Sequence, residues 1–345
     1  MVKAAESAAR RVGVLLPGYN AGKFIGETIQ SVLAQSYGEF ELLIFDNASD
    51  DNTAAVIGSF DDPRINYHRN EINLGFHGNV NLALSATQAT YVVVMNADDV
   101  WERNYLQSTV DFLDGHPDVV FVHTRAIWIN AAGEACGGSP NGRATLSEPR
   151  ETFLSCLSEG FCFASMLMRR EYVQKLWPIP ATEPWKQIVD SWLFLKLALM
   201  GPAGFINEPL IRYRVHSDSV SFDMYADGSF FRRHLASVRE AFSWPEAGAL
   251  GLRADERKAC EKVALESIRI LPIIRIRSSA AQYLRVWWSI VSSVPTVARY
   301  PAAWVRLGFG LLPAPVISAL RNYRQRRWRA SNPASQLEFK SGEML

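Results

Sequence analysis

The chain has 345 residues, 48% of them hydrophobic, which is enough for one large α/β domain and an additional segment. Its formal net charge of +1 argues against a nucleic-acid-binding protein. The four cysteines lack C-x-x-C spacing and a nearby histidine, which argues against a zinc site or a redox motif.

The first hundred residues alternate between short apolar runs and helical patterns. Residues 1–10 contain no apolar run typical of a secretory signal, and we expect a loose leader there. Strands are predicted at 12–17, 41–45, 65–68 and 91–95, and helices at 23–35, 53–59 and 79–86. Such alternation predicts right-handed βαβ units and a mostly parallel sheet.

The next hundred residues have a less regular pattern. We expect a helix at 102–115, a long strand region at 119–129 that turns at 130–134, and a mobile loop at 137–150. An apolar segment at 161–168 precedes a helix at 188–200. Two further strands are predicted at 203–206 and 211–215.

Polar clusters follow several of the predicted strands. They occupy residues 46–53, 73–81, 96–99, 188–190 and 213–216. Because open parallel α/β sheets bind ligands beyond the carboxyl ends of their strands, these clusters indicate one composite site. A nucleotide-activated sugar is the ligand that we expect there.

In this order, the clusters resemble the family 2 glycosyltransferases, inverting enzymes with the GT-A fold. The resemblance covers roughly residues 11–216. It is carried by V14-L-L-P-G-Y-N20, I44-F-D-N-A-S-D-D-N-T53, N73-L-G75 with Asn81, Y91-V-V-V-M-N-A-D-D99, Q187-I-V-D190 and Y213-R-V-H216. It implies an α/β, Rossmann-like, mostly parallel central sheet flanked by helices over 11–220. A C-terminal helical appendage over 221–330 and a flexible tail over 331–345 complete the expected organisation.

The resemblance also implies which residues bind the nucleotide. Asp46 corresponds to the acid that lies against the base and ribose, and a carboxylate suits a pyrimidine because it accepts the ring N–H. The alternative is a helix-capping cluster, with Ser49 or Asp50 capping the next helix. The expected nucleotide-binding residues are Pro17, Tyr19, Asn20, Asp46, Asn73, Gly75, Asn81 and Ala97.

A divalent cation, Mn²⁺ or Mg²⁺, is implied by the cluster N96-A-D-D99. In the family, acids at this position hold a cation that bridges the donor phosphates and offsets the charge of the departing diphosphate. We expect Asp98 and His216 to hold it, with Asn96 and Asp99 as possible further ligands. The neutral Asn96 replaces an acid, which predicts weaker binding of the metal, and the alternative role of Asp98 and Asp99 is to cap a helix. Arg212 or Arg214 could pair with phosphate.

Asp190 corresponds to the catalytic base of the family. An inverting transfer needs one carboxylate to accept the proton of the acceptor hydroxyl while its oxygen attacks the anomeric carbon. The acid that usually precedes this aspartate is replaced by Val189. A helix N-cap is the alternative role for Asp190.

Residues 267–337 contain eleven arginines, several Trp and Tyr residues and no Asp or Glu. Arginine with interfacial aromatic residues suits an anionic membrane surface, so we expect peripheral contact through 267–330, with the protein cytoplasmic on the inner face of the cell membrane. The alternative is a helical appendage with a solvated basic face and its tryptophans in a small core of its own.

The function expected from these observations is the metal-assisted transfer of a single sugar from a nucleotide sugar, a UDP-sugar by preference. The expected acceptor is a glycan or lipid-linked precursor of a surface polysaccharide or glycolipid. A catalytically silent relative that binds nucleotide sugar or glycan is the main alternative. A nucleotidyltransferase is disfavoured because P17-G-Y-N-A-G-K23 is a poor triphosphate loop, and a dehydrogenase because no G-x-G-x-x-G follows a strand.

Overall fold

The computed structural model describes residues 10–138, 145–159, 163–216, 218–219, 224, 229–266 and 280–293, and short pieces between 304 and 323. These residues belong to two compact units. The first contains residues 1–126, 140–213 and 236–261, and the second contains 127–139, 214–235 and 262–345. The expected leader at 1–10, except for residue 10, and the expected tail at 331–345 lie outside the described residues.

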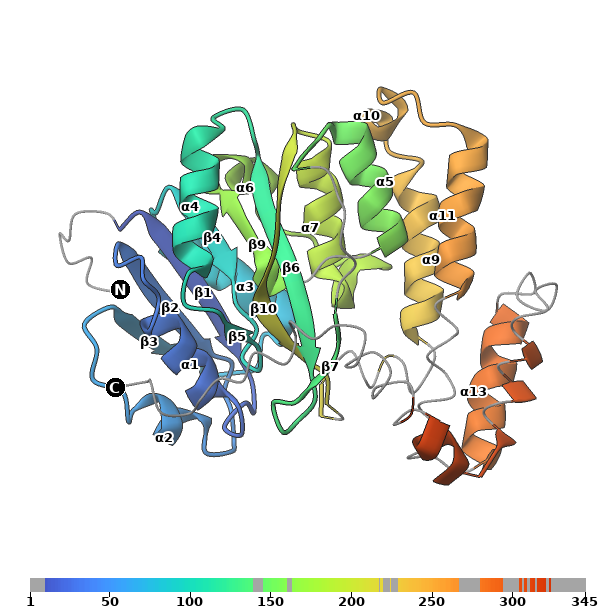
Figure 1. The fold of residues 1–345 in the computed structure, drawn as a ribbon, viewed down its shortest axis with the longest axis horizontal. Helices are drawn as coiled ribbons and strands as arrows, with labels where there is room; N and C mark the ends of the chain where they lie inside the picture. Colours follow the sequence, from blue (N-terminus) through green and yellow to red (C-terminus); the bar gives the residue numbers. More distant parts are fainter. Residues whose placement is uncertain are drawn as a thin grey trace. The chain divides into compact units, whose positions relative to one another are not determined.

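The sheet of the described chain has ten strands, in the order β3-β2-β1-β4-β9-β6-β10-β5, with β7 paired to β6 and β8 to β10 (Figure 1). The first four in this order are parallel to one another, whereas β9 is antiparallel to both β4 and β6. The expected α/β fold with a mostly parallel central sheet is therefore confirmed. The strands are β1 (Val12–Gly18), β2 (Phe40–Asp46), β3 (Ile65–Arg69), β4 (Tyr91–Val94), β5 (Val100–Trp101), β6 (Phe121–Ile129), β7 (Ala135–Gly138), β8 (Leu146–Ser147), β9 (Met166–Arg169) and β10 (Ala203–Arg214).

Helices flank the sheet on both faces (Figure 1). Those of the first half of the chain are α1 (Ile25–Leu33), α2 (Thr53–Ile57), α3 (Gly75–Ala86) and α4 (Tyr105–Gly115). They are followed by α5 (Pro149–Glu159), α6 (Arg170–Leu176) and α7 (Val189–Ala198), with 3-10 turns η1 (Phe163–Ser165) and η2 (Trp185–Gln187). The remaining helices are α9 (Ser229–Ala241), α10 (Pro245–Gly248), α11 (Ala254–Glu266) and α13 (Ala280–Ser293).

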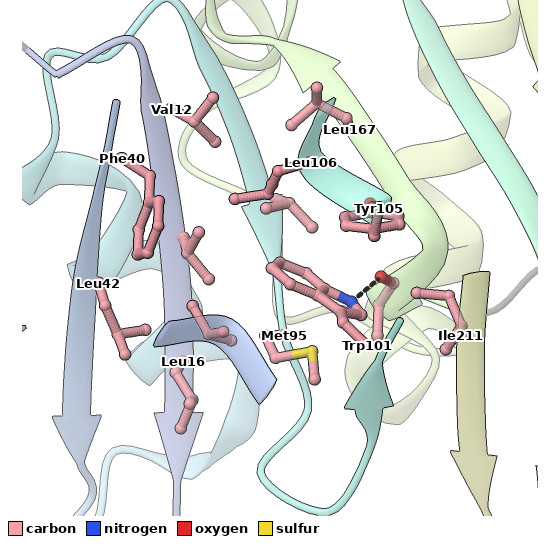
Figure 2. Packing of buried hydrophobic residues seen from close by; sticks show 14 of the residues in the cluster. Val12, Leu16, Phe40, Leu42, Met95, Trp101, Tyr105, Leu106, Leu167 and Ile211 are labelled. Carbon is pink, nitrogen blue, oxygen red and sulfur yellow. Dashed lines mark hydrogen bonds between the residues drawn. The ribbon is translucent and has the colours of Figure 1, made fainter. Parts of the chain in front are cut away.

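Alternate residues of the central strands pack into two hydrophobic cores. In β1, Val14 and Leu16 belong to the core that includes residues of α1 and α4, and Leu15 belongs to the core that includes residues of α3 and α7. Figure 2 shows the first core, with Leu16, Met95 and Trp101 among its members. Because both faces are covered, the strands are apolar throughout, which explains their continuous hydrophobic sequence.

Two expectations about this region need correction. The strands predicted at 203–206 and 211–215 form one strand, β10, which continues through Pro209 where the chain is partly exposed. Proline cannot donate to a strand ladder, and positions open to solvent tolerate it. The loop predicted at 137–150 contains the end of β7, the strand β8 and the start of α5, while 139–144 lie outside the described residues.

Within the part of the chain that is described, no helix combines the length and the hydropathy needed to cross a bilayer. Cys136, Cys156 and Cys260 are free thiols, and Cys162 lies outside the described residues. Burial raises the pKa of the Cys260 thiol to about 11, so this cysteine is a protonated packing residue at neutral pH.

Candidate active site

The loops that follow β1 and β2 are joined by side-chain hydrogen bonds. The backbone N–H of Asn20 donates to Ser49 Oγ at 2.9 Å, and the Asn20 side chain accepts the N–H of Asp50 at 3.0 Å. Asn20 has a left-handed φ of 49°, a conformation that asparagine tolerates better than most residues. The expected nucleotide residues Pro17, Tyr19 and Asn20 therefore lie next to the 46–53 segment, and the Tyr19 side chain is half exposed.

Asp46 ends β2 and is completely buried. Its Oδ1 accepts the N–H of Ser49 at 2.9 Å, and its Oδ2 accepts the Tyr67 hydroxyl at 3.0 Å. Arg69 lies 3.5 Å from the same Oδ2. Tyr67 and Arg69 are themselves 41% and 48% exposed, so in this geometry they, rather than Asp46, present polar groups at the surface.

The helix-capping alternative for the Asp46 cluster is not observed. Helix α2 starts at Thr53, and its first N–H donates to Asp51 Oδ1 at 2.9 Å, whereas Ser49 is engaged with Asn20. Burial is the largest single influence on the Asp51 carboxyl, and it acts to raise the pKa. The hydrogen bonds from Thr53 and Gly22 together outweigh burial, so the pKa of Asp51 lies below its usual range. Asp51 thus ties the start of α2 to the loop after β1.

The N73-L-G75 turn leads into α3. Asn73 Oδ1 accepts the N–H of Gly75 at 2.8 Å, and Gly75 has a positive φ of 71° that glycine adopts without strain. Asn81 is placed differently, because its amide donates to the carbonyl of Ile179 at 3.0 Å and accepts the Ile179 N–H at 2.9 Å. Both ends of the Asn81 amide are therefore engaged by backbone, and its contact with nucleotide stays a prediction.

The N96-A-D-D99 cluster follows β4 and lies beside the loop of β1, since a Cβ on Gly18 would come within 3.9 Å of the Ala97 methyl. Asn96 Nδ2 donates to Asp99 Oδ2 at 2.8 Å, and Asp99 is completely buried. Asp98 is partly exposed. Helix α4 begins only at Tyr105, with Asn104 before it, so Asp98 and Asp99 do not cap that helix.

The oxygen atoms of this cluster suit a cation that arrives together with a phosphate ligand. They suit a metal centre formed by protein side chains alone less well. Among the described residues, no group of three or more His, Cys, Asp or Glu is placed to hold a metal ion. Asp98 and the side-chain carbonyl of Asn96 supply hard oxygens, and Mg²⁺ or Mn²⁺ commonly completes its shell with water and phosphate oxygens. These residues fit such a cation.

His216, the other expected metal ligand, belongs to the second unit. Its Nδ1 accepts the N–H of Asp218 at 3.2 Å. The two arginines considered for phosphate are also engaged, because Arg212 donates to Glu102 at 2.8 Å and Arg214 is buried with a hydrogen bond to the carbonyl of Asn130.

Asp190 lies in the first turn of α7, one residue inside the helix, so it is not the N-cap residue. The side chain is only partly open to solvent, and Ser191 N–H donates to its Oδ1 at 2.8 Å. Desolvation raises the pKa of the Asp190 carboxyl to about 6, and this effect outweighs the hydrogen bonds that favour the charged form. Such a group is ionised at neutral pH and still basic enough to accept a proton.

The start of α7 connects to the other clusters through aromatic packing. Phe194, one turn after Asp190, meets Phe163 edge-on at 5.5 Å, and Phe163 meets Phe76 of α3 at 6.3 Å. The next residue, Ala164, accepts the indole N–H of Trp101 at 3.0 Å, drawn as a dashed line in Figure 2. The 163–165 turn therefore contacts α7, α3 and the strand that follows Asp98 and Asp99.

Sequence reasoning missed Tyr67, Arg69 and Asn47. Tyr67 and Arg69 occupy alternate positions of β3, and Arg69 is paired in register with Asp46 of β2. The sequence contained a signal for Tyr67 and Arg69, because side chains two residues apart in a strand lie on the same face of the sheet. Asn47 directly follows the buried Asp46, and its hydrogen bonds cannot be read from the sequence.

Comparison with known proteins agrees with this architecture. The family model described as glycosyl transferase family 2 matches residues 13–177. The chain is 26% identical over 60% of its length to an uncharacterized glycosyltransferase of Nostoc sp.. It is 31% identical over 36% of its length to the Escherichia coli UDP-Glc:alpha-D-GlcNAc-diphosphoundecaprenol beta-1,3-glucosyltransferase WfgD. The matches span 65% and 56% of the lengths of these two relatives.

Solved structures share the fold at low sequence identity. S. aureus TarS 1-349 in complex with UDP-GlcNAc matches 93% of this chain and 92% of its own length, with 16% identity and a TM-score of 0.53. The mannosyltransferase PcManGT from Pyrobaculum calidifontis, in complex with GDP-Man and Mn²⁺, covers 92% of this chain and 88% of its own, with 18% identity and a TM-score of 0.51. The fold is the GT-A type, and residues 13–177 of the chain match the model of glycosyl transferase family 2.

Proposed function

We propose that this protein is an inverting glycosyltransferase that moves a single sugar from a nucleotide-sugar donor, a UDP-sugar, to a lipid-linked or glycan precursor of a surface polysaccharide or glycolipid. The observation that carries the proposal is Asp190, a desolvated carboxyl at the start of α7 with a pKa of about 6. The match to the family model and the UDP-Glc donor in the name of the E. coli relative support the substrate class.

Asp190 acts as the general base in this proposal. The acceptor hydroxyl oxygen forms a bond to the anomeric carbon while the bond from that carbon to the donor phosphate oxygen breaks. The hydroxyl proton passes to the Asp190 carboxylate, and the nucleoside diphosphate leaves with the electron pair of the broken bond. Attack from the face opposite the leaving group inverts the anomeric configuration.

The nucleotide lies over the loops after β1, β2 and β4. Pro17, Tyr19 and Asn20 form one side, Ala97 lies beside Gly18, and Asn73 with Gly75 form the approach to α3. Asp46 acts on the base either directly or through Tyr67 and Arg69, which it holds and which are open to solvent. Asn81 remains part of the predicted set.

A divalent cation, Mn²⁺ or Mg²⁺, would be held by Asp98, with the Asn96 carbonyl, Asp99 and His216 as further candidates. It would neutralise charge on the donor diphosphate. Asn96 fits a supporting role, because its amide nitrogen is engaged by Asp99 and its side-chain oxygen is the atom that could face a cation.

Helix α13 supports the proposed peripheral contact with an anionic membrane through 267–330. Tyr283, Trp287 and Ile290 are buried on one side of the helix, whereas Leu284 and Trp288 are 43% and 71% exposed. Arg285 is exposed between them. An apolar outer face with arginine, in a stretch without acids, suits anionic lipid headgroups, and a lipid-linked acceptor places the reaction at the inner face of the cell membrane.

The second candidate is a catalytically silent protein that binds nucleotide sugar or glycan. The pairing of Asn96 with Asp99 favours it, because this pairing leaves fewer anionic groups for a metal. A panel of nucleotide sugars, tested for release of nucleoside diphosphate with and without Mn²⁺, separates the two. Steady release of nucleoside diphosphate from one donor supports the enzyme, and binding without release supports the silent relative. Release at the same rate with and without Mn²⁺ would remove the metal from the proposal.

A further inference from the structure

Asn47 joins the end of β2 to the segment that leads into α3. It is 2% exposed and makes three side-chain hydrogen bonds to that segment. Its Oδ1 accepts the side-chain amide of Asn70 at 3.0 Å and the backbone N–H of Leu74 at 2.8 Å. Its Nδ2 donates to Asn73 Oδ1 at 2.8 Å.

These contacts need an amide. Asparagine is both a donor and an acceptor, whereas an aspartate in the same place is an acceptor alone when ionised. Asn73 Oδ1 is already an acceptor, because it also takes the N–H of Gly75 at 2.8 Å. A carboxylate at position 47 would therefore bring two acceptor oxygens together without a proton between them.

Asn70, which bonds to Asn47, makes a further hydrogen bond to another side-chain amide. Asn70 donates to Asn79 Oδ1 at 2.9 Å as well as to Asn47, and Asn79 donates to the carbonyl of Phe45 at 2.7 Å. Asn70 and Asn79 are buried. Asn79 therefore attaches α3 to the body of β2, and Asn47 attaches the turn before α3 to the end of β2.

We propose that Asn47 is a positioning residue for donor binding, which holds the 70–75 turn so that Asn73 and Gly75 are preorganised for the nucleoside diphosphate. The inference rests on the proposed function, because that function places Asn73 and Gly75 at the nucleotide. A preformed turn binds more tightly because little ordering remains to be done when the ligand arrives.

The test compares Asn47→Asp with Asn79→Asp in the full chain. Each variant replaces a buried amide by a carboxylate and removes one donor, and the carboxylate of the N79D variant would still accept the Asn70 amide. Both should lose thermal stability. Only N47D should bind UDP with Mn²⁺ about tenfold more weakly in calorimetry, a change that corresponds to one lost hydrogen bond, and only N47D should exchange the backbone amides of residues 70–75 faster without ligand.

Equal loss of UDP affinity in both variants, or wild-type affinity in folded N47D, would overturn the positioning role. If N47D does not fold, Asn47→Ser removes the amide without adding charge and should show the same two changes. Failure of the wild-type protein to bind any nucleoside diphosphate would refute the proposed function. The ligand-free amide exchange would then decide the role of Asn47, since equal exchange in the two variants contradicts it.

Discussion

Asn96 donates its side-chain amide to the buried carboxylate of Asp99 across 2.8 Å. Asp99 is completely buried, and its backbone carbonyl accepts the Thr28 hydroxyl at 2.8 Å, which fixes the loop after β4 against α1. A neutral donor at position 96 can hydrogen-bond to the Asp99 carboxyl, whereas an acid there would bring a second carboxyl against it. The asparagine therefore stabilises the loop in the absence of a cation.

Asn96→Asp should destabilise the metal-free protein. Two carboxylates within hydrogen-bond distance cannot both ionise easily, so we expect a loss of about 1–3 kcal/mol at pH 8 that shrinks toward pH 5, where one of them becomes protonated. Thermal unfolding in EDTA at both pH values measures this loss. Mn²⁺ should restore part of the stability by lying between the two acids.

Asn104→Asp is the matched control, because Asn104 is an exposed amide near the same loop. It should leave the melting temperature nearly unchanged at both pH values. If N96D is as stable as the wild type in EDTA at pH 8, the Asn96–Asp99 hydrogen bond does not hold this loop.

Asp190→Asn should stabilise the protein at neutral pH. Burial raises the pKa of Asp190 in the folded protein to about 6, from a reference value of 3.8. Between these two pH values the folded protein holds a proton on Asp190 that the unfolded chain releases. The contribution of Asp190 to stability therefore falls as pH rises from about 4 to about 6. The asparagine avoids this loss, and we expect D190N to be about 1–3 kcal/mol more stable at pH 7.5, with no difference below pH 4.

Urea unfolding of both proteins from pH 4 to pH 8 measures the difference. Asp111→Asn, a change at an exposed carboxylate on α4, serves as the control and should show no such pH-dependent gain. A D190N protein less stable than the wild type at pH 7.5 would contradict the desolvation of Asp190.

Replacing Leu284 and Trp288 together by serine should weaken retention on anionic vesicles severalfold, because the exposed apolar face of α13 would be lost while the buried Tyr283, Trp287 and Ile290 remain. Sedimentation with phosphatidylglycerol vesicles at low and high salt measures it. Leu146→Ser removes an exposed leucine from the first unit and should change nothing. Equal sedimentation of the double variant and the wild type would remove α13 from the membrane proposal.

The central strands were predictable because their sequence pattern and their environment agree. Strands β1, β2 and β4 are buried on both faces, which produces continuous apolar runs that end in turn residues, and each starts or ends within about one residue of its predicted position. The helix that precedes β4 was predicted four residues late, at 79 instead of Gly75, because the glycines of N73-L-G-F-H-G indicate a loop.

Irregular segments were harder to predict for identifiable reasons. Helix α5 was missed because only Phe153 and Leu157, one turn apart, form its fully buried apolar pair, which is a weak helical signal. Pro209 divided β10 into two predicted strands, although an exposed position can hold a proline within one strand.

The candidate site residues also divide into those that the sequence predicts and those that only the folded structure shows. Asp46, Asp98 and Asp190 could be predicted as site residues because each lies at a strand end or helix start, within a motif that resembles a known family. Tyr67, Arg69 and Asn47 could not be predicted because their contacts are with residues that only folding brings close, such as the contact between Tyr67 and Asp46. The sequence shows which residues of β3 lie on the same face of the sheet, but it does not show which residues of the neighbouring strand they contact.

The most direct test of the account compares turnover with donor binding in the wild type, Asp190→Asn and the control Asp111→Asn. With the best donor of the panel and Mn²⁺, we predict that D190N loses about 10²- to 10⁴-fold in turnover, the usual contribution of a general base, while its affinity for UDP stays at the wild-type value. D111N should match the wild type in both. A D190N protein that turns over donor at the wild-type rate would contradict the assignment of Asp190 as the base.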